Sequence, residues 1–197
     1  MDDIREDFSK QAEQHNNESY TWEAKIDEIY KRADNNFQDG VNYADSLRLN
    51  DKTLDKLKIS ELLTIVGEIY YDNDSIDLAL ERFHINEKLT SDTPRNKVNK
   101  AGCYIKKGDF DKALTLLNQA AETNYDFYWY IGNFYEIKGE PEKAISQYAY
   151  VYKRDTIVYA DYNKRIQELR KNPDQLMTEL CYKDRRKRTL ILLKGVN

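Results

Sequence analysis

The residue types that most often carry catalysis or bind metals are few in this chain. It has two histidines, His15 and His84, and two cysteines, Cys103 and Cys181. Catalytic triads and zinc sites need such side chains grouped with acids, nucleophiles or further ligands. The histidines lie far apart in the sequence, and the cysteines lack the paired spacing of a zinc site. The sequence therefore predicts a protein that is not an enzyme, with no metal, no cofactor and reduced structural thiols.

Two short patterns imitate functional motifs but fail on their details. Asp72, Asp74 and Asp77 have the spacing of the first ligands in a calcium-binding loop, but the required glycine is missing and Phe83 stands where the closing acid belongs. The tripeptide Asn73-Asp74-Ser75, like the one at residues 17–19, fits the glycosylation pattern, but glycosylation requires a secretory signal and we expect none here. Residues 1–7 are acidic where a secretory signal would be basic and then apolar, and no apolar run approaches the roughly 18 residues that span a bilayer. We expect a cytoplasmic protein that makes no membrane contact.

Four consecutive cations near the end of the sequence are the clearest charge feature. Residues 1–93 carry 22 acidic and 11 basic side chains, whereas residues 157–197 carry 5 acidic and 10 basic ones, and the net charge of the chain is −4. The net charge argues against nonspecific binding of a polyanion by the whole chain. The basic run would nevertheless attract phosphates in a salt-dependent way, which leaves a nucleic-acid-associated regulator as one hypothesis. The four cations are Arg185, Arg186, Lys187 and Arg188.

One spacing pattern recurs three times in the middle of the chain. A small residue is followed three positions later by Tyr, twelve later by Ala and sixteen later by a larger apolar residue, and the small residue advances by 34 and then 31 positions. A period of this length is typical of stacked helical hairpins. A small residue lets two helix backbones approach, and the larger residue fills the space beside it. The three sets are Gly67, Tyr70, Ala79 and Phe83; Ala101, Tyr104, Ala113 and Leu117; and Gly132, Tyr135, Ala144 and Tyr148.

The turns inside these hairpins have suitable chemistry. Lys107–Asp111 and Lys138–Glu142 place Gly where a helix closes in the left-handed conformation, followed by acids or Pro where the next helix starts. Asp72–Ser75 does this without Gly, because Asn and Asp also tolerate that conformation. The sequence thus predicts an all-α protein in which residues 60–156 form three units, 60–93, 94–124 and 125–156.

The third unit resembles the tetratricopeptide repeat (TPR), through Tyr128, Ile131, Gly132, Tyr135, Gly139, Ala144 and Tyr148. The resemblance covers residues 60–156 and implies a TPR-like α-solenoid, a right-handed superhelix of antiparallel helix hairpins whose first helices line a concave groove. The second unit departs from the family with Lys97 and Lys100 at positions that are usually large and apolar. The characteristic proline near the end of each unit is absent or displaced to Pro94.

If the family geometry holds, eleven residues face the groove and make it aromatic and mildly acidic. Relatives that bind chaperone C-termini hold the terminal carboxylate with a set of Lys, Arg and Asn side chains. In this chain only Asn99 corresponds to a member of that set. We therefore expect no carboxylate clamp, and a basic or mixed apolar and basic protein or peptide partner. Trp129 is the expected hot spot. The eleven residues are Thr64, Glu68, Tyr71, Val98, Asn99, Lys106, Asp126, Trp129, Tyr130, Asn133 and Glu136.

Helical segments are expected on both sides of the repeats. Within the acidic segment 1–59, Trp22–Ala33 and Val41–Leu49 have helical periodicity with a break at Gly40, and a diverged fourth repeat is one interpretation. In 157–197, Val158–Arg170 and Pro173–Tyr182 are predicted capping helices that precede the basic tail. The function predicted from the sequence is non-enzymatic protein binding, as an adaptor, a dedicated chaperone or an immunity protein that neutralises a toxin.

Overall fold

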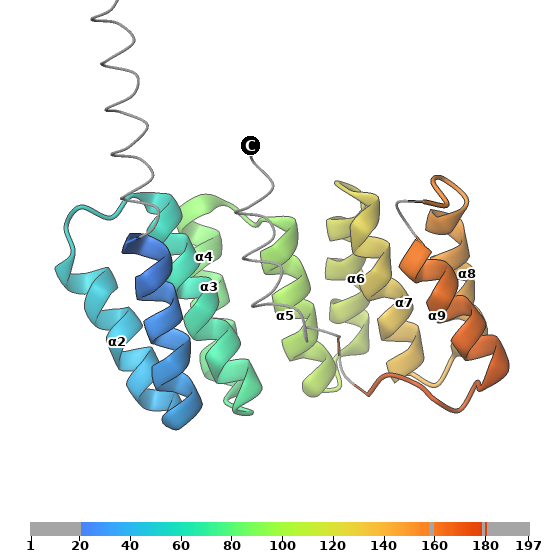
Figure 1. Cartoon of the computed structure of the whole chain (residues 1–197), viewed down its shortest axis with the longest axis horizontal. Helices are drawn as coiled ribbons and strands as arrows, with labels where there is room; N and C mark the ends of the chain where they lie inside the picture. Colours follow the sequence, from blue (N-terminus) through green and yellow to red (C-terminus); the bar gives the residue numbers. More distant parts are fainter. Residues whose placement is uncertain (1–20, 158–159, 179, 181–197) are drawn as a thin grey trace, which may run out of the picture. The chain divides into compact units, whose positions relative to one another are not determined.

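A computed structural model describes residues 21–157, 160–178 and 180. All the regular secondary structure in these residues is helical, which confirms the all-α prediction for the part of the chain described (Figure 1). Residues 21–35 form the first described helix. The others are α2 (Phe37–Asn50), α3 (Lys56–Asp72), α4 (Ile76–Thr90), α5 (Pro94–Lys106), α6 (Phe110–Ala121), the short 3-10 helix η1 (Tyr125–Phe127), α7 (Tyr128–Ile137), α8 (Pro141–Tyr152) and α9 (Ala160–Lys171).

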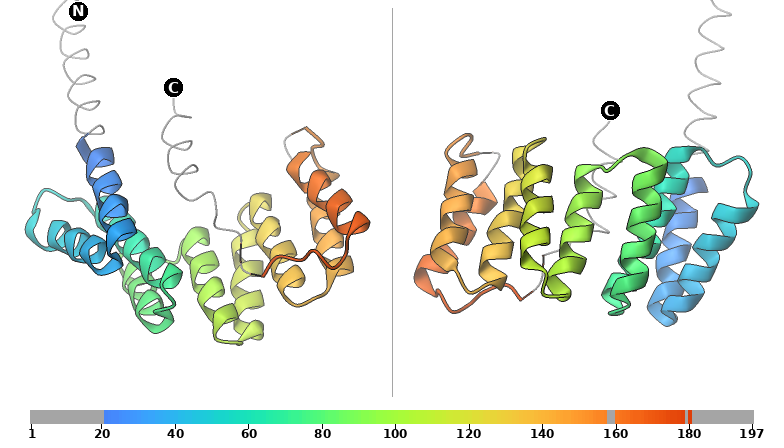
Figure 2. Two further views of the ribbon diagram at one scale, coloured as in Figure 1. Left: turned by 60° about the horizontal axis from the view of Figure 1, so that its bottom comes forward. Right: turned by 180° about the vertical axis from the view of Figure 1, so that it is seen from behind.

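The chain divides into two compact units, each larger than one predicted repeat, the first ending at Thr90 and the second beginning at Ser91. From here on, the first and second units are these two parts of the chain. In the first unit, α3 and α4 pair along their lengths and α2 packs on α3. In the second unit, α5 pairs with α6, α7 pairs with α8, and α9 packs on α8 (Figure 2). Each pair is an antiparallel hairpin, so hairpins form at the positions of all three predicted repeats.

The recurring small residues lie at the closest contacts within the hairpins. A Cβ atom added to Gly67 would come within 2.4 Å of the Phe83 ring, and one added to Gly132 would come within 2.1 Å of the Tyr148 ring. Both distances are far below van der Waals contact, so each aromatic ring occupies the space that a side chain would need. In the second repeat the pair is Ala101 and Leu117, both fully buried in one cluster. Where the first residue of the pair is Gly, the second is an aromatic ring, and where the first is the larger Ala, the second is the smaller Leu.

The hairpin turns close as their sequences predict. Gly108, Gly139 and Asp74 have φ of 77°, 72° and 55°, in the left-handed region. In the turn after α5, the N–H of Asp109 donates to the carbonyl of Tyr104 at 2.9 Å, the bond that closes a Schellman motif. Equivalent bonds close the turns after α3 and α7. Three hairpins therefore share one turn geometry although one of them lacks glycine.

The connection between the first two described helices differs from its prediction. The break falls at Asn36 and not at Gly40, because the Asn36 side chain caps α2 by accepting hydrogen bonds from the N–H groups of Gln38 and Asp39. Gly40 lies inside α2, where an added Cβ would come within 2.6 Å of Ala33 Cβ. Its role is a close helix contact and not a turn.

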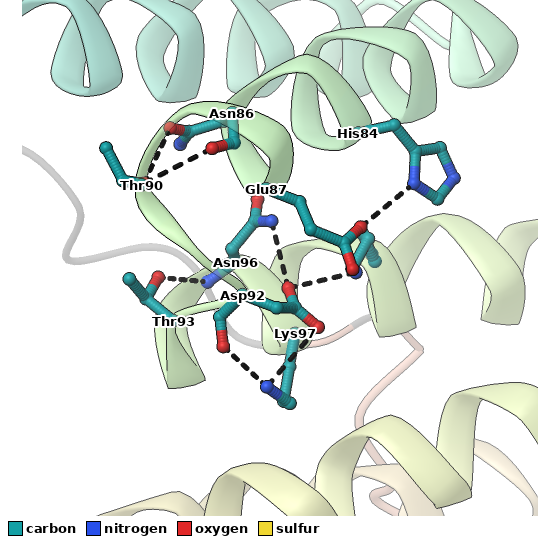
Figure 3. A network of polar contacts seen from close by, with 9 residues as sticks. His84, Asn86, Glu87, Thr90, Asp92, Thr93, Asn96 and Lys97 are labelled. Atoms are coloured by element: carbon teal, nitrogen blue, oxygen red, sulfur yellow. Dashed lines mark hydrogen bonds and ion pairs between the residues drawn. The ribbon is translucent and has the colours of Figure 1, made fainter. Parts of the chain in front are cut away.

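The two lysines that depart from the TPR pattern converge on one carboxylate. Asp92, just before α5, lies 2.9 Å from Lys100 Nζ and 3.3 Å from Lys97 Nζ, and it accepts a hydrogen bond from Asn96 (Figure 3). The Lys100 side chain is only 4% exposed. Burial alone would raise the pKa of Asp92, but the hydrogen bond and the charge of Lys100 outweigh it, and the pKa lies below its ordinary value. Ion pairing thus replaces the apolar packing expected at these two positions.

The chain after α9 is not the helix predicted from Pro173. The described residues 172–178 and 180 are non-helical, and the segment runs back from α9 past α7 towards the α5–α6 hairpin (Figures 1 and 2). Leu176 packs against the buried cluster of α8 and α9, whereas Leu180 belongs to the buried cluster of α5, α6 and α7. The segment thus places two leucines, four positions apart, in two different clusters of the second unit.

Candidate functional site

The eleven residues predicted to line a groove lie partly in each unit and differ widely in exposure. Three are on α3 of the first unit, and the other eight are on α5, η1 and α7 of the second. Their role in binding a partner stays a prediction. Glu68, Tyr71, Val98, Asn99, Asn133 and Glu136 are buried, Thr64, Trp129 and Tyr130 are half-buried, and Lys106 and Asp126 are exposed.

In the first unit, Thr64 joins α3 to α4. Its hydroxyl accepts a hydrogen bond from Asn86 Nδ2 at 2.9 Å and donates to the Ser60 carbonyl. Asn86 is itself buried, and its backbone carbonyl and side-chain oxygen accept bonds from Thr90 (Figure 3). The amide of Asn86 is thereby held by partners on both helices.

In the second unit, the inward face of α7 carries a buried polar network around Glu136. Tyr148 on α8 donates its hydroxyl hydrogen to Glu136 Oε1 at 2.7 Å, and Asn133 Nδ2 donates to the Tyr148 oxygen at 2.7 Å. All three side chains are fully buried. Buried polar groups are costly unless they are satisfied, and here each one meets a partner of the opposite polarity.

Arg165 on α9 supplies the positive charge for this network. Its guanidinium contacts both carboxylate oxygens of Glu136, with Nε 3.1 Å from Oε1, and also bonds to Glu168. The hydrogen bonds to Glu136 raise the pKa of Arg165 further above its ordinary value. Burial and the charge of Glu136 raise the pKa of Tyr148, which therefore remains a hydrogen-bond donor.

The same acid–base pair holds the backbone of the returning segment. Glu136 Oε2 accepts a hydrogen bond from the Met177 N–H at 3.0 Å, and Arg165 donates to the Gln175 carbonyl at 2.9 Å. The pair therefore contacts two backbone groups of the segment, on either side of Leu176.

Aromatic side chains surround this network. The Trp129 ring lies 5.0 Å from the Tyr148 ring and 5.1 Å from the Tyr162 ring of α9, in tilted and edge-on arrangements. The Tyr162 hydroxyl donates to the Asp126 carbonyl at 3.0 Å. Trp129 is thus half-buried by α8 and α9, and these contacts fix the orientation of its ring.

Several residues of the site were not found by sequence reasoning. Arg165, Met177 and the leucines at 176 and 180 lie in segments read as capping helices, and nothing in their spacing relates them to Glu136. The helix predicted from Pro173 rested on the position of that proline, which is permitted in a first helical turn and carries no information about contacts distant in sequence. The sequence placed Glu136 in the groove as an acid for a basic partner, whereas its cation is Arg165 of the same chain.

Other predicted features fall outside the described residues, among them Arg185, Arg186, Lys187 and Arg188, as well as His15 and Cys181. Cys103 is a buried free thiol. In the part of the chain that the structure describes, no cluster of three or more His, Cys, Asp or Glu side chains has an arrangement that fits a metal ion. None of the helices described there combines the length and the apolar character needed to cross a membrane.

Comparison with known proteins gives a likeness to solved structures alone. The chain matches no protein-family model and none of the curated proteins. Fourteen solved chains match, including two crystal structures of MamA, each at 18% identity with a TM-score of 0.48. The first match covers 73% of this chain and 94% of that one, and the second covers 81% and 97%. At this identity and TM-score the likeness carries no argument about function.

Proposed function

We propose that this protein is a non-enzymatic module that binds a protein or peptide partner, and that the inward face of the second unit does the binding. The inward face is the surface around Glu136 and Arg165 that contacts residues 175–178 and 180. One observation carries the proposal: this face holds non-helical polypeptide, residues 175–178 and 180, through Glu136, Arg165 and two apolar clusters. A surface that satisfies both the backbone and the side chains of an extended segment has what peptide recognition requires. The three hairpins are then TPR-like repeats of a right-handed superhelix.

The chemistry of this face narrows the partner expected from the sequence. Glu136 already has Arg165 as its counter-ion, which lowers what its carboxylate can contribute to binding a basic group. The segment that occupies the face contributes buried leucine and half-buried methionine. We therefore propose an apolar partner segment at the second unit. Such a module suits an adaptor, a dedicated chaperone or an immunity protein that occludes a toxin.

Capture of the native partner tests this proposal. The tagged full-length chain is used as bait in extract of its own cell, and the captured protein is then titrated against the wild type and Trp129→Ala. Loss of a hot-spot tryptophan weakens binding by about 2 kcal/mol or more. Trp22→Ala is the matched control, since Trp22 is the other tryptophan and lies in the first unit, where its Nε1 donates to Glu61.

The two variants separate the outcomes. Weaker binding by Trp129→Ala alone, with helicity unchanged, supports the inward face of the second unit as the binding surface. Equal affinity of wild type and Trp129→Ala, or an equal loss in both variants, contradicts the proposal. Far-UV circular dichroism and thermal unfolding of each variant establish that the comparison is between folded proteins.

A further inference from the structure

We propose that Glu136 and Arg165 form a clamp for the backbone of an extended peptide, and that the chain's own residues 175–178 and 180 occupy it as a competing internal ligand. The inference rests on the proposed function, and it adds the ligand class and a form of regulation. The occupant is an extended segment with an apolar residue between the two clamped backbone groups and a second apolar residue four positions later.

The clamp recognises backbone and not sequence. Its two bonds go to the carbonyl of Gln175 and the N–H of Met177, which every extended peptide presents on one edge unless proline follows the central residue. Tyr148 and Asn133 are tied to Glu136 behind the clamp, so its carboxylate is fixed before a peptide arrives. Fixed donors and acceptors are a feature of binding sites that is not needed to end a helix.

Selectivity then comes from the two apolar positions. Leu176 packs against the cluster that contains Tyr148 and Ile166, and Leu180 is 1% exposed within the cluster that contains Val98. Burial of a leucine side chain stabilises a complex by removing apolar surface from water, fully at Leu180 and in part at the half-buried Leu176. Two leucines at this spacing therefore distinguish a matching segment from a polar one, while the exposed Thr178 between them makes no such contribution.

The internal segment competes because it is covalently attached. Only a few residues separate α9 from the clamp, so the effective concentration of the segment is of millimolar order, and a free peptide of equal intrinsic affinity is excluded until the segment leaves. A partner that carries a better matching segment, or that holds residues 175–180 elsewhere, gains access to the face. The contact is thus an autoinhibitory one.

A synthetic peptide with the sequence Asn172–Leu180 and blocked ends is the probe for the clamp. It is titrated by fluorescence anisotropy against the full-length wild type and the full-length double variant Leu176→Asp, Leu180→Asp, whose own segment no longer fits the clusters. We expect the double variant to bind at least about tenfold more tightly, since internal competition is removed. Equal affinities, or no binding to either chain up to about 1 mM peptide, would overturn the proposal.

Matched controls isolate the cause. Leu49→Asp with Leu57→Asp makes the same change of charge at leucines of the first unit that are 67% and 75% exposed, and it should leave the affinity at the wild-type value. A peptide methylated on the nitrogen that corresponds to Met177 lacks the clamped N–H and should bind the double variant at least about tenfold more weakly. Unchanged binding of the methylated peptide would contradict backbone recognition.

A measurement on the wild type covers the case in which the double variant does not fold. Addition of excess peptide should speed hydrogen exchange in residues 175–178 of the chain, because the internal segment is displaced, while α7 stays protected. Unchanged exchange in those residues contradicts displacement. If Trp129→Ala loses the native partner but the peptide neither binds nor displaces, the clamp is wrong and the proposed function stands. If the peptide binds and displaces the internal segment but binding of the native partner does not depend on Trp129, the clamp stands and the proposed function is wrong.

Discussion

Glu136 has the residue type expected of a surface acid in a groove, yet its carboxylate is buried and shared by three elements. It accepts from Tyr148 on α8, contacts Arg165 on α9 and accepts the N–H of Met177 beyond α9. Removing one member of a buried ion pair is far more costly than the pair is favourable, because the remaining charge is left without compensation. The network should therefore respond strongly to a change at Arg165.

Arg165→Gln should lower the free energy of unfolding of the second unit by about 3–5 kcal/mol, because it leaves the Glu136 carboxylate buried without a cation. The control is Arg170→Gln, an exposed change in the same helix that should cost under about 0.5 kcal/mol. Urea unfolding is followed by Trp129 emission in a Trp22→Phe background, in which Trp129 is the one tryptophan. Similar losses in the two variants would mean that Arg165 does not neutralise Glu136.

Asp92→Asn should destabilise the second unit by about 2 kcal/mol, because it removes the carboxylate shared by Lys97 and the buried Lys100. Asp111→Asn, in the exposed first turn of α6, is the control and should cost less than about 1 kcal/mol. The same Trp129 emission measures both variants. A loss at Asp111 equal to that at Asp92 would show that these lysines do not depend on the ion pair.

At the scale of elements, the hairpins are specified by matched pairs of residues. Gly67 with Phe83 and Ala101 with Leu117 occupy the same two positions of the repeat, and the larger first member goes with the smaller second one. Packing at native density makes such positions interdependent, so a change at one is tolerated only with a change at the other.

Gly67→Ala should cost about 1–3 kcal/mol although Ala is the better helix former, since its Cβ would lie 2.4 Å from the Phe83 ring. Phe83→Leu should also destabilise, through the cavity that it leaves. The double variant recreates the Ala–Leu pair of the second repeat and should lose less than the sum of the single changes. Trp22 emission in a Trp129→Phe background measures all three, and strict additivity would contradict the pairing.

The hairpins could be predicted from sequence because their signals are local and repeated. The twelve-residue interval and the left-handed turn residues at Gly108 and Gly139 each act within one hairpin. The segment after α9 was predicted wrongly because its conformation is set by groups distant in sequence: Glu136, which holds Met177, and the cluster that takes Leu180. Tertiary contacts there override a local pattern that fits a helix. The same distance hid the counter-ion of Glu136.

For the molecule as a whole, the division at Thr90 means that one free energy of unfolding does not describe the chain unless both units unfold together. The sequence offers a way to separate them, since each unit contains one of the two tryptophans, Trp22 in the first and Trp129 in the second. Variants that keep one tryptophan report on one unit within the intact protein. Dependence on pH can be assigned to a unit in the same way.

Stability of the second unit at high pH should depend on Tyr148. Its pKa is raised in the folded chain by burial and by the charge of Glu136, whereas in the unfolded chain it is about 10. The stabilisation is complete below the unfolded pKa and is lost as pH rises above it, because the unfolded chain then releases a proton that the folded chain retains. This one group should lower the free energy of unfolding by about 1.4 kcal/mol per pH unit above pH 10.

Tyr148→Phe keeps the ring but removes that titration. At neutral pH it should cost about 1–3 kcal/mol, because the Glu136 carboxylate loses a hydrogen-bond donor and Asn133 loses an acceptor. Between about pH 10.5 and 11.5 its unfolding free energy should fall less steeply than that of the wild type, by the slope of one proton. Tyr150→Phe, at a ring that is 46% exposed, is the control for the loss of a tyrosine hydroxyl at neutral pH. Unfolding titrations followed by Trp129 emission give the slopes, and identical slopes for wild type and Tyr148→Phe would mean that Tyr148 ionises as readily in the folded unit as in the unfolded chain.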